Sequence, residues 1–397
     1  MITIRRVENL PLTQNARVFY RVDYNVPLEG TRITDATRIE ETLQTLQYLR
    51  GRGAAIVLAS HLGRPKGTRN AKYSLRPVRD KLAELTGAEV QWADDCAGAD
   101  TTKLGPGEML LVENLRFHDG EEKNNPAFAE QLRTLADFYV NDAFGASHRA
   151  HASIDALPRL FPKENTAGGF LLAKEIKFLQ KVTNITERPF VALMGGAKIA
   201  GKIEPLEALV KLADKILIGG GMANTFLAAR GIPMGGSLVD RESLEVAQRI
   251  MESSATGGAR AELVLPVDLV VADSLENPTE IDEDADVSDG YTDTEKAFDI
   301  GPRTIKEFEA ELKEAKLIFW NGPMGVFEKE QFAKGTMAMA RAVAQADAIT
   351  VVGGGESVEA IKASGFASKI THISTGGGAS LEFISGETLP GVEVLRE

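Results

Sequence analysis

Charged side chains that could bind anions follow the apolar segments in the first half of the chain, and glycine clusters follow them in the second half. The first-half segments are followed by Asp23 and Asn25, by His61 and Arg64, by Arg116, and by His148, Arg149 and His151. The second-half segments run into MGGAKIAGK, IGGGMAN, WNGPMG, VVGGGES and STGGGAS. Arginine offers a planar fork that binds phosphate or carboxylate, and glycine lets backbone N–H groups approach phosphate oxygens. The two halves are therefore predicted to bind two different anions.

The elements that must position these residues are the strands of parallel sheets. Short apolar runs rich in β-branched residues alternate with helical patterns, as when AAIVLAS is followed by LRPVRDKLAELTG. This alternation is typical of βαβ units, and open parallel sheets bind ligands beyond the carboxyl ends of their strands. We therefore predict an α/β fold of two Rossmann-like domains. Each would be a mainly parallel sheet flanked by helices, and a hinge helix would join them across a central cleft.

A length of 397 residues with 43% hydrophobic content favours two domains. We expect a first domain over residues 1–165, a hinge helix over 166–185 and a second domain over 186–378. The remaining tail, 379–397, begins as the helical segment SLEFISG. The pattern leaves open whether this tail packs near the hinge or on the first domain.

Charge and cysteine content exclude several classes of protein. The net charge of −12 argues against non-specific binding to nucleic acid or to an anionic membrane. The single Cys96 excludes an internal disulfide and suits a reducing compartment. The first residues lack the apolar stretch of a signal peptide, and no apolar run approaches the roughly 20 residues that span a bilayer. We expect a soluble, cytoplasmic protein.

Two segments partly match known ligand-binding loops. Residues 196–203 fit seven positions of a P-loop, but Ile203 replaces the magnesium-binding Ser or Thr. They are read as another kind of phosphate-facing loop with Lys198 and Lys202 on one side of a helix start, or as a loop whose lysines are only solvated. The acidic residues 276–293 suggest a calcium loop, but Val287 stands where glycine is needed. A solvated surface loop is expected there.

The remaining histidines and the cysteine point to structural roles. Neither His118 nor His372 has metal-ligand spacing to another His or to Cys, so both are expected to be structural or surface groups. Cys96 follows Asp94 and Asp95, whose charges raise the pKa of a thiol. A reactive thiol is therefore not expected.

Eight motifs occur together and in order: RVDYNVP, HLGRP, ENLRFH, YVNDAFGASHRAHAS, GGAKIAGK, GGGMANTF, WNGPMGVFE and STGGGASLE. With this set the chain resembles the phosphoglycerate kinase family over nearly its whole length. The resemblance implies reversible, Mg-dependent phosphoryl transfer between 1,3-bisphosphoglycerate and ADP, giving 3-phosphoglycerate and ATP in glycolysis or gluconeogenesis. It further implies Mg²⁺ with ATP or ADP as cofactor, small-molecule substrates only, and a monomer that bends at its hinge.

The resemblance also assigns residues to roles. In the first domain, 3-phosphoglycerate binding is implied for Asp23, Tyr24, Asn25, Arg38, His61, Leu62, Gly63, Arg64, Arg116 and Arg149. In the second, nucleotide binding is implied for Lys198, Lys202, Gly219, Gly220, Gly221, Gly301, Gly322, Met324, Glu328, Gly353, Gly354, Gly355, Glu356 and Ser357. Catalytic roles are implied for Arg38, Lys198, Gly376 and Gly377. Glu356, where the family usually has Asp, is expected to hold the magnesium of the nucleotide.

The implied chemistry needs no catalytic base, because the attacking carboxylate, with a pKa of about 4, is already ionised at neutral pH. The tasks left to the protein are to position the reactants and to stabilise the charge on the transferred phosphoryl group. Two other functions stay open: a phospholigand-binding protein without catalysis, and a kinase for another small carboxylate.

His148 and His151, which flank Arg149, either shape the anion site or contact the ligand. The residues just before Asp299 depart from the family pattern, so nucleotide contacts there are the least secure.

Overall fold

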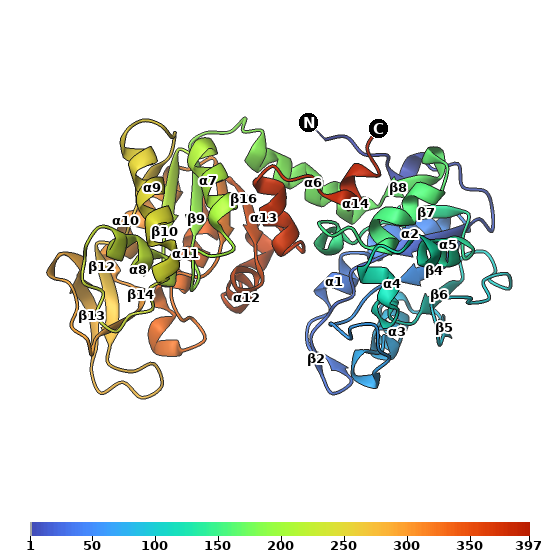
Figure 1. Cartoon of the computed structure of the whole chain (residues 1–397), viewed down its shortest axis with the longest axis horizontal. Coiled ribbons are helices and arrows are strands. Elements are labelled where there is room, and N and C mark those ends of the chain that lie inside the picture. Colours follow the sequence, from blue (N-terminus) through green and yellow to red (C-terminus); the bar gives the residue numbers. More distant parts are fainter. Residues whose placement is uncertain (1) are drawn as a thin grey trace. The chain divides into compact units, whose positions relative to one another are not determined.

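The computed structural model describes residues 2–397 and divides into two compact units (Figure 1). Among the described residues, unit 1 contains residues 2–177 and Thr388–Glu397, and unit 2 contains Phe178–Glu387. The boundary falls inside helix α6 (Phe170–Thr183). Each unit has a parallel sheet flanked by helices, so the predicted α/β class with two Rossmann-like domains is confirmed. No helix in residues 2–397 combines the length and apolar character needed to cross a membrane.

Unit 1 is built on a six-stranded sheet of order β5-β6-β4-β1-β7-β8 in which all neighbours are parallel. The strands are β1 (Arg17–Arg21), β4 (Ala55–Ala59), β5 (Val90–Ala93), β6 (Met109–Val112), β7 (Phe138–Asn141) and β8 (Thr166–Gly168). The remaining elements are the hairpin β2 (Leu28–Glu29) and β3 (Arg32–Ile33), and the helices α1 (Thr37–Glu40), α2 (Leu43–Gly51), α3 (Arg76–Thr86), α4 (Asp119–Glu122), α5 (Pro126–Arg133) and α14 (Pro390–Glu393). Every residue of β4 and β6 is buried, which fits strands covered on both faces.

Unit 2 repeats this architecture with the strand order β11-β10-β9-β15-β16-β17, again parallel throughout. These strands are β9 (Phe190–Met194), β10 (Lys215–Ile218), β11 (Glu262–Val264), β15 (Leu317–Asn321), β16 (Ile349–Gly353) and β17 (His372–Ile373). The helices are α7 (Ile203–Leu212), α8 (Gly220–Ala229), α9 (Leu244–Ala255), α10 (Pro302–Glu314), α11 (Lys334–Gln345), α12 (Gly355–Ala363) and α13 (Gly378–Ile384). Within each unit the parallel order places the carboxyl ends of the strands at one edge, which is where the predicted ligand-binding residues stand.

The acidic segment 276–293 is only partly the surface loop expected from its sequence. Ile281–Asp286 is strand β13, which pairs with β12 (Asp268–Ala272) in a three-stranded antiparallel sheet completed by β14 (Lys296–Ile300). The many acidic residues of this segment suggested a loop. The apolar strand β12, however, pairs with a neighbouring strand on each side, and β13 is one of the two. The acidic residues Asp282, Glu283 and Asp284 are exposed on the edge strand, which suits a solvated edge.

The end of the chain belongs to unit 1. Ile4 pairs with Arg396 in an isolated bridge, and the two ends of the chain lie side by side (Figure 1). The Gly391 backbone N–H donates to Ser147 O at 2.9 Å, and the Arg5 guanidinium donates to Val394 O at 2.7 Å. These contacts tie the last ten residues to the first residues of the chain and to the segment that follows β7.

Candidate functional site

The first group of predicted residues follows strand β1 in unit 1. Arg38, in α1, donates from Nη1 to Asp23 Oδ2 at 3.1 Å and to Asn25 O at 3.2 Å. Asn25 in turn accepts the Gly63 backbone N–H at 2.9 Å through Oδ1. The Arg38 side chain is one-third exposed, and its Nη2 and Nε have no partner among the described residues. Arg38 is therefore held at one end and can present the rest of its fork to a ligand.

A second group, behind this one, is buried. His61 Nδ1 lies 3.3 Å from Arg21 Nη2, and His61 Nε2 lies 3.8 Å from Asp23 Oδ1. Burial, followed by the charges of Arg116 and Arg21, holds the pKa of His61 well below its usual value. The imidazole is therefore neutral at pH 7. Arg116 is only 5% exposed, and its Nη1 donates to Gly63 O at 2.8 Å.

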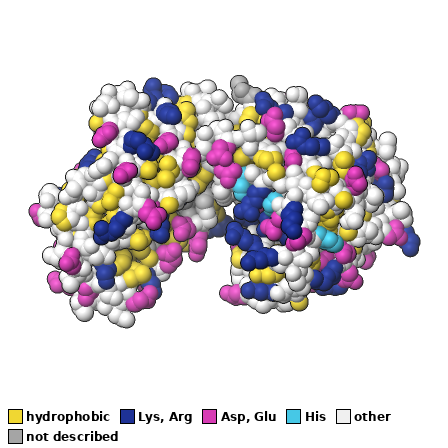
Figure 2. Space-filling model, viewed as in Figure 1, with side chains coloured by type: hydrophobic (Ala, Val, Ile, Leu, Met, Phe, Trp, Pro, Cys, Tyr) yellow, Lys and Arg dark blue, Asp and Glu magenta, His cyan; other side chains and the backbone are white. Residues whose placement is uncertain are grey.

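Arg149 and two histidines complete the cluster. Burial, then the charges of Arg116 and Arg21, lowers the pKa of His151 to about 3. Arg149 Nε lies 3.1 Å from His148 Nε2. Arg116 Nε and His151 Nδ1 are buried without a hydrogen-bond partner among residues 2–397. Arg116 Nε has a longer ion-pair contact, 3.5 Å to Glu122 Oε1. Buried polar atoms that lack hydrogen bonds mark a place where an anion would fit. Figure 2 shows Lys and Arg gathered with His on the visible face of unit 1.

Three of the predicted substrate-site residues take other positions. The Tyr24 side chain is fully buried, and its hydroxyl lies 2.9 Å from Thr42 Oγ1. The Leu62 side chain is also in the core, so only the backbone of these two residues could meet a ligand. Arg64 is exposed on the same loop as Gly63. Gly63 has φ +62°, and a Cβ there would lie 2.4 Å from the Tyr73 ring, so this position requires glycine.

Sequence reasoning missed Arg21, which is fully buried at the end of β1. Its Nε donates to Ser153 Oγ at 2.8 Å, its Nη1 donates to Val22 O, and its Nη2 lies 3.8 Å from Glu121 Oε1. Glu121 Oε1 also accepts the Ser153 hydroxyl at 2.6 Å. A charged residue inside the otherwise apolar run RVFYRV was the signal that could have found it, because such residues are buried only when paired.

The phosphate-facing loop of unit 2 follows strand β9. Lys202 is largely buried, and its Nζ donates to Gly195 O at 2.8 Å. Burial lowers the pKa of Lys202, while the charge of Glu356 raises it. Gly322 has φ +93°, and a Cβ there would lie 2.2 Å from Gly195 O and 2.8 Å from Lys202 Nζ. The backbone segments after β9 and β15 therefore approach so closely that only glycine fits between them.

Glu356 and Ser357 begin helix α12 after Gly354, whose φ is +90°. Ser357 Oγ accepts the Gly322 backbone N–H, which ties the helix start to the loop after β15. A cavity of about 270 Å³ is lined here by Lys202, Asn321, Gly322, Gly354, Gly355, Glu356, Ser357, Gly377, Gly378 and Leu381. A cation, a carboxylate and helix-start N–H groups thus face one small space.

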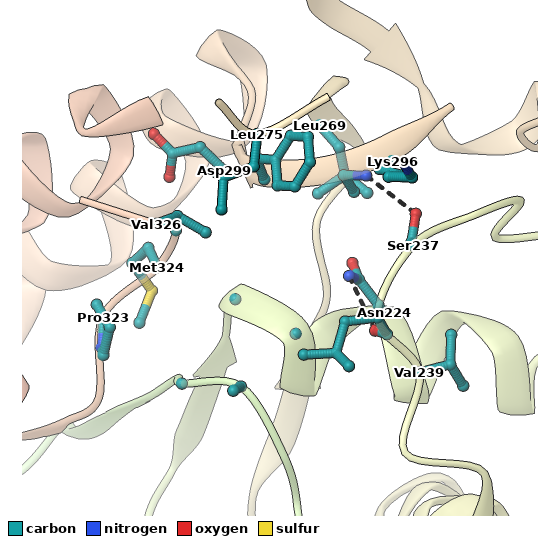
Figure 3. A pocket seen from close by; sticks show the side chains of 18 of the residues that line it. Asn224, Ser237, Val239, Leu269, Leu275, Lys296, Asp299, Pro323, Met324 and Val326 are labelled. Carbon is teal, nitrogen blue, oxygen red and sulfur yellow. Dashed lines mark hydrogen bonds between the residues drawn. The ribbon is translucent and has the colours of Figure 1, made fainter. Parts of the chain in front are cut away.

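A larger cavity of about 630 Å³ adjoins it, since Glu356 lines both. Figure 3 shows the apolar side chains of Leu269, Leu275, Val326 and Met324 around this space. Gly220, Gly221 and Glu328 also line it, together with Asn224, Ser237, Val239, Lys296, Phe298 and Asp299. Of these four apolar residues the sequence predicted only Met324. The apolar walls suit a flat ring, and the polar side chains of the same cavity suit a sugar.

Several predicted nucleotide or catalytic residues do not line either cavity, and these include Gly219 and Gly353. Gly301 is the N-cap of α10, and a Cβ there would lie 2.4 Å from the Asp268 carboxyl carbon; it is not part of the cavity lining. The Gly376 N–H donates to Ser374 Oγ at 3.1 Å, whereas Gly377, with φ +54°, lines the smaller cavity. Lys198 is exposed and lines neither cavity.

Replacing Gly322 by alanine is expected to abolish nucleotide binding. The new Cβ would collide with the Gly195 carbonyl and with Lys202 Nζ, and the residue would keep a backbone conformation unfavourable for L-residues. We expect titration calorimetry to show loss of ADP binding, and 3-phosphoglycerate binding to persist. Gly258→Ala is the matched control, since its Cβ would meet nothing closer than 3.5 Å. ADP affinity in Gly322→Ala equal to that of the control would contradict the close approach.

Asp299 provides a pH-dependent contribution to stability. Burial raises its pKa to about 7, and its carboxylate accepts the N–H groups of Gly335 at 2.7 Å and Ile300 at 2.9 Å. A carboxyl group whose pKa is higher in the folded state binds its proton more tightly there than in the unfolded chain. Its contribution to the free energy of unfolding therefore falls as pH rises from about 4 to about 7, and it stays constant above pH 7. The free energy of unfolding relative to Asp299→Asn should therefore fall by at most about 4 kcal/mol over this range. Urea titrations of both proteins test this, and parallel pH profiles would exclude it.

Comparison with known proteins agrees with this geometry. A family profile described as phosphoglycerate kinase matches residues 7–387. A phosphoglycerate kinase of Moorella thermoacetica is 51% identical over 389 residues, covering 96% of this chain and 97% of the relative. One from Leptospira biflexa is 49% identical over 383 residues, covering 96% and 95%. Among solved structures, phosphoglycerate kinase from Coxiella burnetii has a TM-score of 0.88 at 37% identity and covers 99% of both chains. That from Pyrococcus horikoshii has a TM-score of 0.86 at 32% identity, covering 99% and 98%.

Proposed function

We propose how this chain, which belongs to the phosphoglycerate kinase family, uses its own residues in the family reaction. That reaction is reversible phosphoryl transfer between 1,3-bisphosphoglycerate and ADP, giving 3-phosphoglycerate and ATP, and the chain is a phosphotransferase. The assignments below concern which side chains bind each substrate. The observation that carries them is a pair of buried polar atoms in the cluster of unit 1, Arg116 Nε and His151 Nδ1, that make no hydrogen bond within residues 2–397. Arg116 Nε has only a longer ion-pair contact, 3.5 Å to Glu122 Oε1.

Unit 1 binds 3-phosphoglycerate in this proposal. Arg64, Arg116 and Arg149 hold its 3-phosphate, and the neutral His61 donates a hydrogen bond to the same group. Asp23 and Asn25 hold the hydroxyl and carboxyl side, while Tyr24, Leu62 and Gly63 contribute backbone only. Arg38 reaches the carboxyl oxygen that receives the phosphoryl group. The positively charged guanidinium groups of this cluster repel one another, and a bound anion would offset that repulsion. The cluster therefore suits an anionic ligand.

Unit 2 binds the nucleotide. The larger cavity takes the base between its apolar walls, with Gly219, Gly220, Gly221 and Met324 beside it and Glu328 toward the ribose. Lys202, Gly322 and the helix start Gly353–Ser357 face the phosphates, where backbone N–H groups and the helix dipole favour negative charge. Lys198, Gly376 and Gly377 stabilise the phosphoryl group in transit. Gly301 acts indirectly, by closing the turn into α10.

The residues present fit a magnesium ion carried by the nucleotide. Glu356 supplies an exposed carboxylate at the rim of both cavities, and oxygen is the ligand type that Mg²⁺ takes. When bound, the ion neutralises charge on the phosphate oxygens. Glu356 would hold it directly or through a water, because the side chain is one methylene longer than the Asp usual in the family. We further propose that the protein acts as a cytoplasmic monomer, which sedimentation equilibrium can test.

The two substrates belong to different units, so transfer requires their reacting oxygens to approach to about 3–3.5 Å. We propose a closing motion about helix α6, which contains the boundary between the units. Exclusion of water would protect the acyl phosphate from hydrolysis. Small-angle scattering is expected to show a smaller radius of gyration when 3-phosphoglycerate and MgADP are both present than with either alone. An unchanged radius would exclude the motion.

The activity itself is tested by formation of ADP from ATP in the presence of 3-phosphoglycerate across a magnesium titration. The 1,3-bisphosphoglycerate formed is followed by coupling to NADH oxidation through glyceraldehyde-3-phosphate dehydrogenase. We expect saturable turnover with 3-phosphoglycerate and none with glycerate, which lacks the 3-phosphate. Binding without turnover at any magnesium concentration would instead indicate a non-catalytic phospholigand-binding protein. Turnover with glycerate would indicate a different acceptor pocket.

A further inference from the structure

Three side chains of unit 1 form a metal-ligand set away from the anion cluster. The sequence spacing between His118 and Cys96 gave no sign of a shared site, but the fold brings the two residues together. Strands β5 and β6 are neighbours in the sheet, so the segments that follow them meet. One ligand atom from each of Asp95, Cys96 and His118 lies within 4.8 Å of the other two.

From this arrangement we propose that Asp95, Cys96 and His118 form a binding site for a divalent transition-metal ion of the Zn²⁺ class, with water as the fourth ligand. Thiolate, imidazole and carboxylate are the three ligand types that Zn²⁺ takes in proteins. A tetrahedral site with bonds of about 2.0–2.3 Å has ligand atoms about 3.3–3.8 Å apart. The present atoms therefore need to move by about an ångström, which rotation of side chains at the ends of two loops can supply.

The contacts around the set fit this role. His118 Nε2 lies 2.6 Å from Asp95 Oδ1, so a proton now occupies the space between two of the ligands. The His118 ring stacks on Phe128 with centroids 5.0 Å apart, which fixes the plane of the imidazole. Arg69 Nη2 lies 3.5 Å from Asp95 Oδ2 and balances that carboxylate when no ion is bound. A dication would balance the carboxylate together with a thiolate, and binding would release the thiol proton.

A nucleophilic Cys–His–Asp arrangement is the competing interpretation, and the surroundings disfavour it. Cys96 is almost fully buried, and the carboxylate of Asp95 is one of its neighbours. Reactive cysteines need the opposite, a positive and partly exposed environment. A metal ion overcomes this barrier because it binds the thiolate directly.

A metal ion bound at this site would affect the anion cluster through Arg116. His118 follows the short 3-10 helix Leu115–Phe117, which carries Arg116. An ion bound to His118 would hold this turn against the segment after β5. We therefore infer a structural ion rather than one that takes part in phosphoryl transfer.

The test uses Co²⁺ as the probe, with the nucleotide-free full chain. Cys96 is the only cysteine, so a thiolate-to-cobalt charge-transfer band in the near ultraviolet can arise only there. We expect this band at one equivalent of Co²⁺, its displacement by Zn²⁺, and its loss in Cys96→Ser. In competition with a chromophoric chelator, Zn²⁺ affinity should fall more than about 100-fold in Cys96→Ser and in His118→Gln.

Asp94→Asn is the matched control, because Asp94 adjoins the set but pairs with Arg76 instead. Its Zn²⁺ affinity should equal that of the unmodified chain. The wild-type spectrum decides the matter even if a variant fails to fold. Absence of the charge-transfer band with saturating Co²⁺, or Zn²⁺ binding that Cys96→Ser leaves intact, would overturn the proposal. Neither outcome depends on the phosphotransfer activity.

Discussion

Replacing Arg38 by alanine is expected to lower kcat by about 100- to 1,000-fold, the cost of removing one donor that stabilises charge in a transition state. The KM for MgATP should hardly change, because Arg38 belongs to unit 1, where its Nη1 is held by Asp23 at 3.1 Å. Steady-state kinetics with each substrate varied in turn provide the measurement. Arg38→Lys should recover only part of the loss, because an ammonium cannot reproduce the planar fork.

Two further measurements separate this role from a structural one. Arg32→Ala is the matched control, since Arg32 is an exposed arginine of the same unit whose ion pair within residues 2–397 is with Glu29 on the β2–β3 hairpin. Free guanidinium added to Arg38→Ala should restore part of kcat if the missing group acts on the reacting oxygens. A kcat within threefold of wild type, or a loss explained by an equal fall in folded protein, would show that Arg38 only neutralises Asp23.

The fold could be predicted from the sequence for a physical reason, and so could the position of several candidate residues at the ends of strands. Ligand-binding residues of parallel sheets stand directly after the strands, and strands such as AIVLA and MLLV are recognisable as short, continuous apolar runs. His61 and Arg116 each follow such a run, and the structure places both in one cluster. The parallel strand order within unit 1 supplies this proximity, since it brings consecutive strand ends to one edge.

Features that depend on side-chain direction or on pairing between distant segments could not be predicted. Tyr24 matches a site motif, but its ring enters the core, where its hydroxyl meets Thr42. Strand β13 pairs with the apolar strand β12, and this pairing was not predicted because the acidic composition of β13 is typical of a surface loop. The proximity of Cys96 to His118 follows from β5 and β6 being neighbours, a fact of strand order that periodicity does not contain.

Replacing Glu356 by glutamine is expected to weaken MgADP binding and to strengthen binding of metal-free ADP. Glu356 lies in the first turn of α12 beside Lys202, where the helix dipole and the lysine attract phosphate while the carboxylate repels it. A carboxylate at such a position is favourable only when a cation lies between it and the phosphates. The two affinities should therefore change in opposite directions, with kcat falling at least about 10-fold and the magnesium requirement rising.

Calorimetric titrations with ADP, with and without Mg²⁺, measure both effects. Glu359→Gln, one turn further along the same helix and also exposed, should leave both affinities unchanged. Glu356→Asp should keep most of the turnover, because it restores a carboxylate at the length usual in the family. If Glu356→Gln weakened both forms of ADP equally, the side chain would serve the fold of the helix start and not the metal. If Glu356→Gln changed neither affinity, magnesium would be held by the nucleotide and water alone. The longer side chain at this position would then have no effect on magnesium binding.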